Sequence, residues 1–194
     1  GQAVWRYNFK RPDDVTCLHV YEGRTGLGLV PLSDDLMYMY LTTAEPDNTR
    51  YPIEGIAAVM REKVPKTSPR IAALAEQITD DDGVVYRPLE GMFVDGDWHR
   101  GRVVLLGDAV HATTPHLGQG AGMAIEDAIV LAEEIDRAET PQEAFTAYQD
   151  RRYERCKYIV DASLEICRGQ LGLAPPPDQV KASTEMFQTV AEPI

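Results

Sequence analysis

The first third of the chain carries apolar and β-branched residues in short runs, which is the pattern of β-strands. Residues 3–43 are rich in such residues, which gather in three runs at 15–21, 27–32 and 36–43. Between the first two runs, the segment 22–26 (Glu-Gly-Arg-Thr-Gly) is typical of a hairpin turn. We therefore expect this region to form a sheet.

Helical spacing of apolar residues takes over after a polar loop. We expect one helix over 52–64 and a second over 69–78, each opening on a proline that suits a first helical turn. Short strands are then predicted over 84–89 and 92–94. The uninterrupted apolar run 103–106 predicts a strand that is buried on both sides.

Two long helices are expected in the second half. The first opens on a glycine-rich loop and ends near Arg137, and it has apolar residues at one helical face that we expect to be buried. These positions are 121, 124, 125, 128, 132 and 135.

The second long helix is marked by Thr140, Pro141 and Glu143, which form a capping box with proline at the first helical position. It continues for about 30 residues with a buried stripe, to Gly172 and the prolines 175–177. The stripe comprises Phe145, Tyr148, Cys156, Ile159, Ser163, Ile166 and Leu171. Residues 173–194 are expected to form a tail, with one short helix or none.

The bulk properties exclude several classes of protein. A net charge of −12 over 194 residues argues against a nucleic-acid surface, which requires a basic footprint. The longest apolar runs are far shorter than the roughly 20 residues of a membrane span. Cys17, Cys156 and Cys167 form an odd set without CxxC spacing, which favours reduced thiols and a cytoplasmic location.

The segment with the most chemical information follows the apolar run 103–106. The run ends in Gly107 and Asp108, a polar turn follows, and closely spaced glycines then open the long helix. A carboxylate at a strand end beside a helix N-terminus is typical of a ligand site in α/β proteins, because backbone N–H groups and the positive helix end converge there. The Asp108 carboxylate can accept hydrogen bonds from a ribose-type diol.

This segment resembles the second FAD-binding motif of the class A flavoprotein monooxygenases, the FAD-dependent aromatic hydroxylases with the p-hydroxybenzoate hydroxylase fold. The matching residues are Gly107, Asp108, Ala109, His111, Pro115, Gly118, Gly120 and Glu126 to Ala128. The strand–GxGxxG–helix that opens proteins of this family is absent from the sequence. The resemblance therefore implies the C-terminal part of a longer enzyme, and we expect this chain to be inactive without the other half.

The implied fold is a mixture of α/β and α+β. Residues 1–88 correspond to the family's substrate-binding sheet domain with its helices, whose sheet covers the flavin ring. Residues 89–172 correspond to the strand–Gly-Asp–loop–helix part of the FAD domain with long helices, and 173–194 form the tail.

The resemblance also implies which residues bind FAD. The Asp108 carboxylate lies near the ribityl chain, backbone N–H groups at the helix start face the pyrimidine edge of the flavin, and Pro115 shapes the loop beside it. His111 holds the loop through a hydrogen bond. The full implied cofactor set is Gly107, Asp108, Pro115, Gly118, Gly120, Ala121 and Gly122. No metal site is expected, and Glu126 and Asp127 are interpreted as helix-surface or interdomain charges.

Candidate substrate residues are drawn from the sheet and the flavin loop: Tyr7, Tyr21, Pro31, Tyr38 and His116. Alternation along a strand places Tyr38 and Tyr40 on one face, as it does Trp5 and Tyr7. For each aromatic residue, ordinary sheet packing is the alternative. Arg6 or Arg24 is a candidate for binding a substrate carboxylate.

The implied function is an FAD- and NAD(P)H-dependent monooxygenase that hydroxylates an aromatic or heteroaromatic small molecule through a flavin C4a-hydroperoxide. The flavin performs the chemistry, so no catalytic side chain is assigned. Two alternatives stay open: a dehydrogenase relative that does not insert oxygen, and a non-catalytic small-molecule binding module. The substrate, the choice of NADH or NADPH and the oligomeric state are also open.

Overall fold

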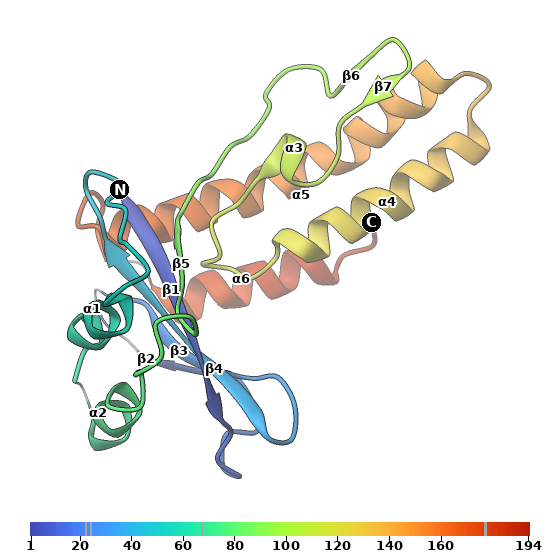
Figure 1. Ribbon diagram of the computed structural model, residues 1–194. Helices are drawn as coiled ribbons and strands as arrows, with labels where there is room; N and C mark the ends of the chain where they lie inside the picture. Colours follow the sequence, from blue (N-terminus) through green and yellow to red (C-terminus); the bar gives the residue numbers. More distant parts are fainter. Residues whose placement is uncertain (22, 24, 67, 177) are drawn as a thin grey trace. The chain divides into compact units, whose positions relative to one another are not determined.

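A computed structural model describes residues 1–21, 23, 25–66, 68–176 and 178–194, and the chain divides into two compact units (Figure 1). The first unit is Gly1–Leu89 and the second is Glu90–Ile194. Each unit has its own hydrophobic core.

The first unit is built on an antiparallel sheet with the strand order β2-β3-β4-β1-β5. Its strands are β1 (Gln2–Lys10), β2 (His19–Tyr21), β3 (Leu27–Pro31), β4 (Leu36–Ala44) and β5 (Val85–Pro88). The central pair, β1 and β4, is in register from Gln2 opposite Ala44 to Lys10 opposite Leu36. The strand predicted over 15–21 begins only at His19. The hairpin turn predicted over 22–26, and with it Arg24, falls partly outside the described residues.

Helices α1 (Ile56–Lys63) and α2 (Pro69–Ala75) pack on one face of this sheet. The expected helix start at Pro52 is wrong, because Gly55 adopts φ +82° and α1 begins after it. The Asp81 carboxylate accepts hydrogen bonds from the backbone N–H groups of Gly55 and Ala57, at 2.8 Å each. A distant side chain therefore supplies the cap that the local sequence lacks.

The two faces of the sheet differ. The helix-covered face carries Trp5 and the apolar residues of β3 and β4, and Tyr7 and Tyr21 pack against this core. Tyr38 lies on the other face, where its ring is 5.6 Å from the Arg6 guanidinium carbon. The expected alternation is confirmed, and it separates Tyr38 from Tyr7 and Tyr21.

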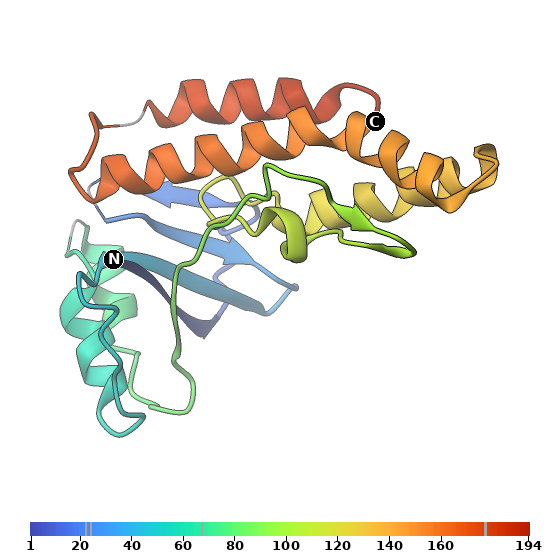
Figure 2. The ribbon, with the colours of Figure 1, turned by 90° about the horizontal axis from the view of Figure 1, so that it is seen from above.

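The second unit contains short strands followed by long helices, and Figures 1 and 2 show α6 running alongside α5. Its elements are β6 (His99–Arg100), β7 (Val103–Val104), α3 (Asp108–His111), α4 (Gly120–Arg137), α5 (Pro141–Gln170) and α6 (Gln179–Ala191). The end of α4 and the capping box of α5 are confirmed. The expected tail holds α6, whose Met186 is buried.

Two predictions for this unit are wrong. Residues 92–94 form no strand; the Met92 and Val94 N–H groups instead donate to the Ala112 and Val110 carbonyls, beside α3. The buried strand over 103–106 is reduced to β7, which pairs only with β6 among the described residues and leaves Val103 65% exposed.

The buried face of α4 also differs from the prediction. Its buried residues are Met123, Asp127, Val130 and Glu134. The predicted apolar face instead lies open: its Ile125 and Ile135 are 63% and 55% exposed, and the neighbouring Ile129 is 46% exposed. The helix therefore buries a face of two apolar and two acidic residues, and presents an isoleucine-rich face that no described residue of this unit buries.

Candidate functional site

The turn after β7 is shaped by Gly107. Its backbone adopts φ +57° and ψ −139°, a conformation that residues with a side chain rarely adopt. A Cβ at this position would lie 3.2 Å from the Ala124 Cβ on α4. Glycine thus lets the turn pass closely against the helix, and it places Asp108 at the start of α3.

Asp108 lies at the wall of an open cavity of about 520 Å³ at the beginning of α4. The lining residues are Asp108, Thr113, Pro115, Gly118, Gly120, Ala121 and Ala124. Five residues of the expected cofactor set therefore line one cavity. The other two are not in this lining: Gly107 is buried directly before Asp108, and Gly122 is exposed in the first turn of α4.

The first turn of α4 presents backbone donors. Its N-cap residue, Gln119, makes no side-chain cap, and Met123 N–H donates to the Gln119 carbonyl at 2.9 Å. The N–H groups of Gly120, Ala121 and Gly122 precede this bond and so have no acceptor within the helix. Together with the positive end of the helix dipole, they suit an electron-rich group.

The glycines keep this surface close to the backbone. Gly118 has φ +67°, and a Cβ at Gly120 would come within 3.2 Å of the Thr113 methyl carbon. A carboxylate, free N–H donors and a wall without side chains fit the ribityl and pyrimidine parts of FAD. The residues that would hold these parts are Asp108 and the first turn of α4.

Behind the cavity wall, one buried carboxylate joins three segments. Asp127 of α4 accepts hydrogen bonds from the Gly107 N–H at 2.8 Å and from Arg152 Nε at 2.9 Å. His111 Nε2 lies 2.7 Å from the same carboxylate. Asp127, His111 and Arg152 are each 0% exposed, so the interpretation of Asp127 as a surface or interdomain charge is wrong.

The charges in this cluster are compensated. Arg152 also pairs with Glu126 at 2.6 Å, and Glu126 pairs with Arg155 at 3.1 Å. Burial alone would raise the pKa of Asp127, but hydrogen bonds from His111, Gly107 and Arg152 lower that pKa to about 2. Asp127 is therefore ionised at neutral pH although it is buried.

His111, Asp127 and Cys156 each offer an atom that could bind a metal, and these atoms lie within 4.8 Å of one another. Burial raises the pKa of the Cys156 thiol to about 12, which keeps it protonated and a poor ligand. The Arg152 guanidinium already supplies a positive charge to Asp127. The cluster therefore has the chemistry of an ion pair rather than of a metal centre.

Both ring nitrogens of His116 lie within hydrogen-bond distance of other side chains. Its Nδ1 lies 3.0 Å from Thr114 Oγ1 and its Nε2 lies 3.2 Å from Gln170 Oε1. Burial lowers the pKa of His116 and so favours the neutral ring. This histidine links the loop between α3 and α4, residues 112–119, to the end of α5.

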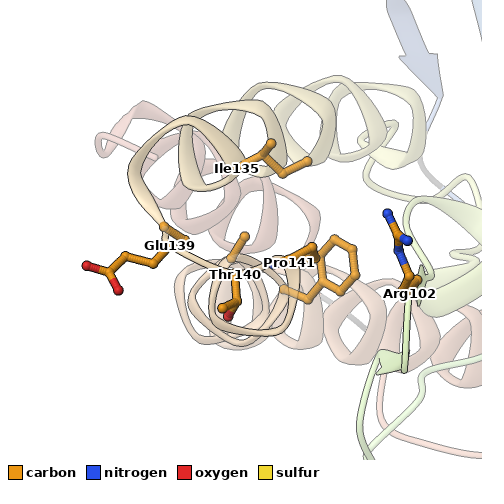
Figure 3. Close-up of a pocket in the computed structure, with 8 residues that line it drawn as sticks. Arg102, Ile135, Glu139, Thr140 and Pro141 are labelled. Atoms are coloured by element: carbon orange, nitrogen blue, oxygen red, sulfur yellow. The ribbon is translucent and has the colours of Figure 1, made fainter.

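A second cavity, of about 320 Å³, lies at the opposite end of α4 (Figure 3). Arg102 and Ile135 are among the residues that line it, and the Glu139 side chain points away from Arg102. Ile135 is fourteen residues along α4 from Ala121, which corresponds to about 21 Å at 1.5 Å per residue. This cavity is therefore separate from the Asp108 site.

Sequence reasoning named Asp127 but did not foresee its burial, and it missed Arg152. One signal was present, because Tyr148, Arg152 and Cys156 are spaced by four residues, so Arg152 continues the buried stripe predicted for α5. A charge inside such a stripe requires a buried partner.

Comparison with known proteins identifies the family. The sequence profile of the family described as "FAD binding domain" matches residues 3–163. The chain belongs to this family. Its resemblance to FAD-dependent monooxygenases is confirmed, and FAD is the cofactor of the family.

The chain is 35% identical over 176 residues to the putative FAD-dependent monooxygenase YetM of Bacillus subtilis, covering 88% of this chain and 47% of that protein. It is 36% identical to 2-heptyl-3-hydroxy-4(1H)-quinolone synthase of Pseudomonas aeruginosa, covering 89% of this chain and 45% of that protein. The chain thus spans about half the length of these curated relatives.

The fold is also shared with a solved flavoprotein. Klebsiella pneumoniae HpxO, complexed with FAD and uric acid, superposes with a TM-score of 0.79 at 22% identity, over 99% of this chain and 49% of that chain. The expected fold class is confirmed by this likeness. No described helix is long and apolar enough to cross a membrane.

Proposed function

We propose that the chain forms part of an FAD- and NAD(P)H-dependent monooxygenase that hydroxylates an aromatic or heteroaromatic small molecule. The observation that carries the proposal is the cavity shared by Asp108 and the first turn of α4, in a chain of the FAD-binding family. The names of the relatives support monooxygenase activity, and the uric acid bound by HpxO supports a heteroaromatic substrate.

In this proposal the chain's residues bind and orient the cofactor. The Asp108 carboxylate accepts hydrogen bonds from ribityl hydroxyls, and the N–H groups of Gly120, Ala121 and Gly122 donate to the pyrimidine edge of the flavin. The helix dipole favours the negative charge that collects at this edge on reduction. Pro115 forms part of the wall and helps to exclude water. FAD itself, reduced by NADH or NADPH, supplies the activation of dioxygen and the transfer of one oxygen atom.

The two units have different proposed roles. Residues 1–88 supply the substrate-binding sheet and residues 89–172 supply this part of the FAD domain. The sheet face that carries Tyr38 and Arg6 is the better candidate for substrate contact, because Tyr7 and Tyr21 pack against the helix-side core. Pro31, at the end of β3, and His116 complete the candidate set.

The exposed face of α4 supports placing the rest of the cofactor site elsewhere in a longer polypeptide. An isoleucine-rich helix face and an apolar strand with one short partner are normally covered in a finished domain. We therefore propose that this chain does not turn over substrate by itself.

The test uses the complete polypeptide as encoded. After purification, its flavin spectrum is recorded, and NADH or NADPH oxidation is followed with a panel of phenols, quinolones and purines under ¹⁸O₂. The proposal expects bound FAD and one ¹⁸O atom in the product. Bound FAD with hydrogen peroxide as the sole oxygen product for every compound would favour a relative that does not insert oxygen.

A further inference from the structure

We propose that Asp127 is the positioning residue of the FAD site: its carboxylate, paired with Arg152, fixes the Gly107–Asp108 turn against the first turn of α4. The inference rests on the proposed role of Asp108 and α4 in holding FAD. It assigns a function to a residue that does not line the cavity.

The geometry links both walls of the cavity through one side chain. Asp127 Oδ2 accepts the N–H of Gly107, which directly precedes Asp108. Asp127 is also on α4, two helical turns from the residues that open the helix. The distance between the Asp108 carboxylate and the α4 donors therefore depends on this hydrogen bond.

The same oxygen contacts the far end of α3. His111 Nε2 lies 2.7 Å from Asp127 Oδ2, and the His111 N–H donates to the Gly107 carbonyl at 3.0 Å. Asp127 thus anchors α3 at its N-cap and at its last residue. Asp108, which begins α3, has its backbone fixed from both sides although its side chain is free to meet a ligand.

Arg152 orients the carboxylate. Its Nε donates to Oδ1, and its Nη2 donates to the Met123 carbonyl at 3.4 Å. With Oδ1 engaged by Arg152, Oδ2 is left to face Gly107 and His111. A fixed ion pair of this kind preserves the orientation of a turn that glycine alone would leave adjustable.

The chain offers a matched control one heptad along α4. Glu134 is 8% exposed, lies on the same helix face, and pairs with Arg151 of α5 as Asp127 pairs with Arg152. Among its described contacts, the Glu134 carboxylate binds only Arg137 and Arg151, and neither Gly107 nor His111. Glu134→Gln therefore removes an α4–α5 ion pair while leaving the loop anchor intact.

The experiment compares FAD binding by Asp127→Asn, Asp127→Glu and Glu134→Gln in the complete polypeptide. In Asp127→Asn, the amide oxygen is drawn to Arg152 and the NH₂ group meets the Gly107 N–H, two donors face to face. FAD affinity is measured by flavin fluorescence on titration of apoprotein, visible circular dichroism reports the flavin environment, and thermal unfolding reports stability.

We expect Asp127→Asn to raise the FAD Kd about tenfold or more and to change the visible circular dichroism. Glu134→Gln should change the Kd less than about twofold and cost less stability, because Arg151 keeps its second partner, Glu133. Asp127→Glu keeps the charge but moves the acceptor by one methylene, and we expect it to fold and still bind FAD more weakly. If Asp127→Asn does not fold, the FAD affinity of Asp127→Glu tests the inference instead. Wild-type FAD affinity and circular dichroism in both Asp127 variants would overturn the inference alone, whereas a wild-type protein without FAD affinity would overturn the proposed function as well.

Discussion

The Asp127 carboxylate and the Gly107 backbone N–H are 2.8 Å apart, although twenty positions separate the two residues in the chain. This hydrogen bond joins the N-cap of α3 to the middle of α4 inside the second unit. It is buried and charge-assisted, so it is among the stronger single contacts available to a loop. Its loss would release the residue that precedes Asp108.

Gly107→Ala tests the backbone requirement of this turn. Gly107 combines φ +57° with ψ −139°, a conformation outside the left-handed helical region that costs an alanine roughly 1–3 kcal/mol, and its Cβ would press on Ala124 at 3.2 Å. We expect a loss of at least ~1 kcal/mol of unfolding free energy, measured by urea titration. Gly101→Ala is the control, since Gly101 has φ +61° but a Cβ added there would meet no heavy atom within 4 Å. A loss in Gly107→Ala no larger than in Gly101→Ala would contradict the expected cost of this turn, because Gly107 carries both the unusual ψ and the contact with Ala124.

Asp108→Asn tests the proposed ribityl contact. Loss of a charge-assisted hydrogen bond is expected to raise the FAD Kd of the complete polypeptide by about tenfold. Stability of the apoprotein should change little, because the Asp108 side chain is exposed. Asp136→Asn, at the exposed far end of α4, should leave the Kd unchanged. An unchanged Kd in Asp108→Asn would remove Asp108 from the cofactor site.

The lowered pKa of Asp127 predicts a specific pH dependence. The folded carboxyl has a pKa of about 2, below the roughly 3.9 of an unfolded aspartate, so the unfolded state takes up the proton first as pH falls. Stability from this group is therefore complete above about pH 5 and is lost as pH falls toward 2. The difference in unfolding free energy between wild type and Asp127→Asn, about 3 kcal/mol at pH 7 because the buried Arg152 loses one of its two carboxylate partners, should shrink steadily from pH 5 to pH 3. A difference that does not vary with pH would contradict the ionised assignment.

Gly28 and Tyr40 form a pair that a double-mutant cycle can resolve. They are opposite each other on β3 and β4, and a Cβ on Gly28 would lie 2.3 Å from the Tyr40 ring. Gly28→Ala should destabilise the protein by about 1–3 kcal/mol, although alanine normally favours a strand interior over glycine. In a Tyr40→Ala background, the same change should be neutral or stabilising. Urea unfolding of the four proteins measures the coupling, and additive effects would show that Tyr40 does not occupy the space above Gly28.

The elements that could be predicted are those with local signals. Helix α5 begins where Thr140 and Glu143 form their capping box, since all the required groups lie within four residues. The start of α1 could not be predicted, because its cap is the Asp81 carboxylate, twenty-six positions from Gly55. The apolar face of α4 could be recognised, but periodicity does not say which surface covers it.

The candidate site likewise has a part that local sequence predicts and a part that depends on long-range contacts. Gly107, Asp108 and the glycines at the start of α4 form one short motif, so their sequence alone pointed to the cavity that Asp108, Gly118 and Gly120 line. The anchor behind that cavity depends on Arg152, twenty-five positions from Asp127. A single acidic residue in a helix is usually solvated, and only the fold shows that this one is buried.

The exposed isoleucines of α4 suggest a way to study how the cofactor site assembles. Ile125 and Ile129 are 63% and 46% exposed, so this face of α4 is an apolar surface on which another polypeptide segment can pack. If the proposed function holds, the two halves of the enzyme, made as separate polypeptides, would assemble on that surface and develop a flavin colour on mixing. Fragment complementation would then report, by eye, whether the two halves of the cofactor site have come together.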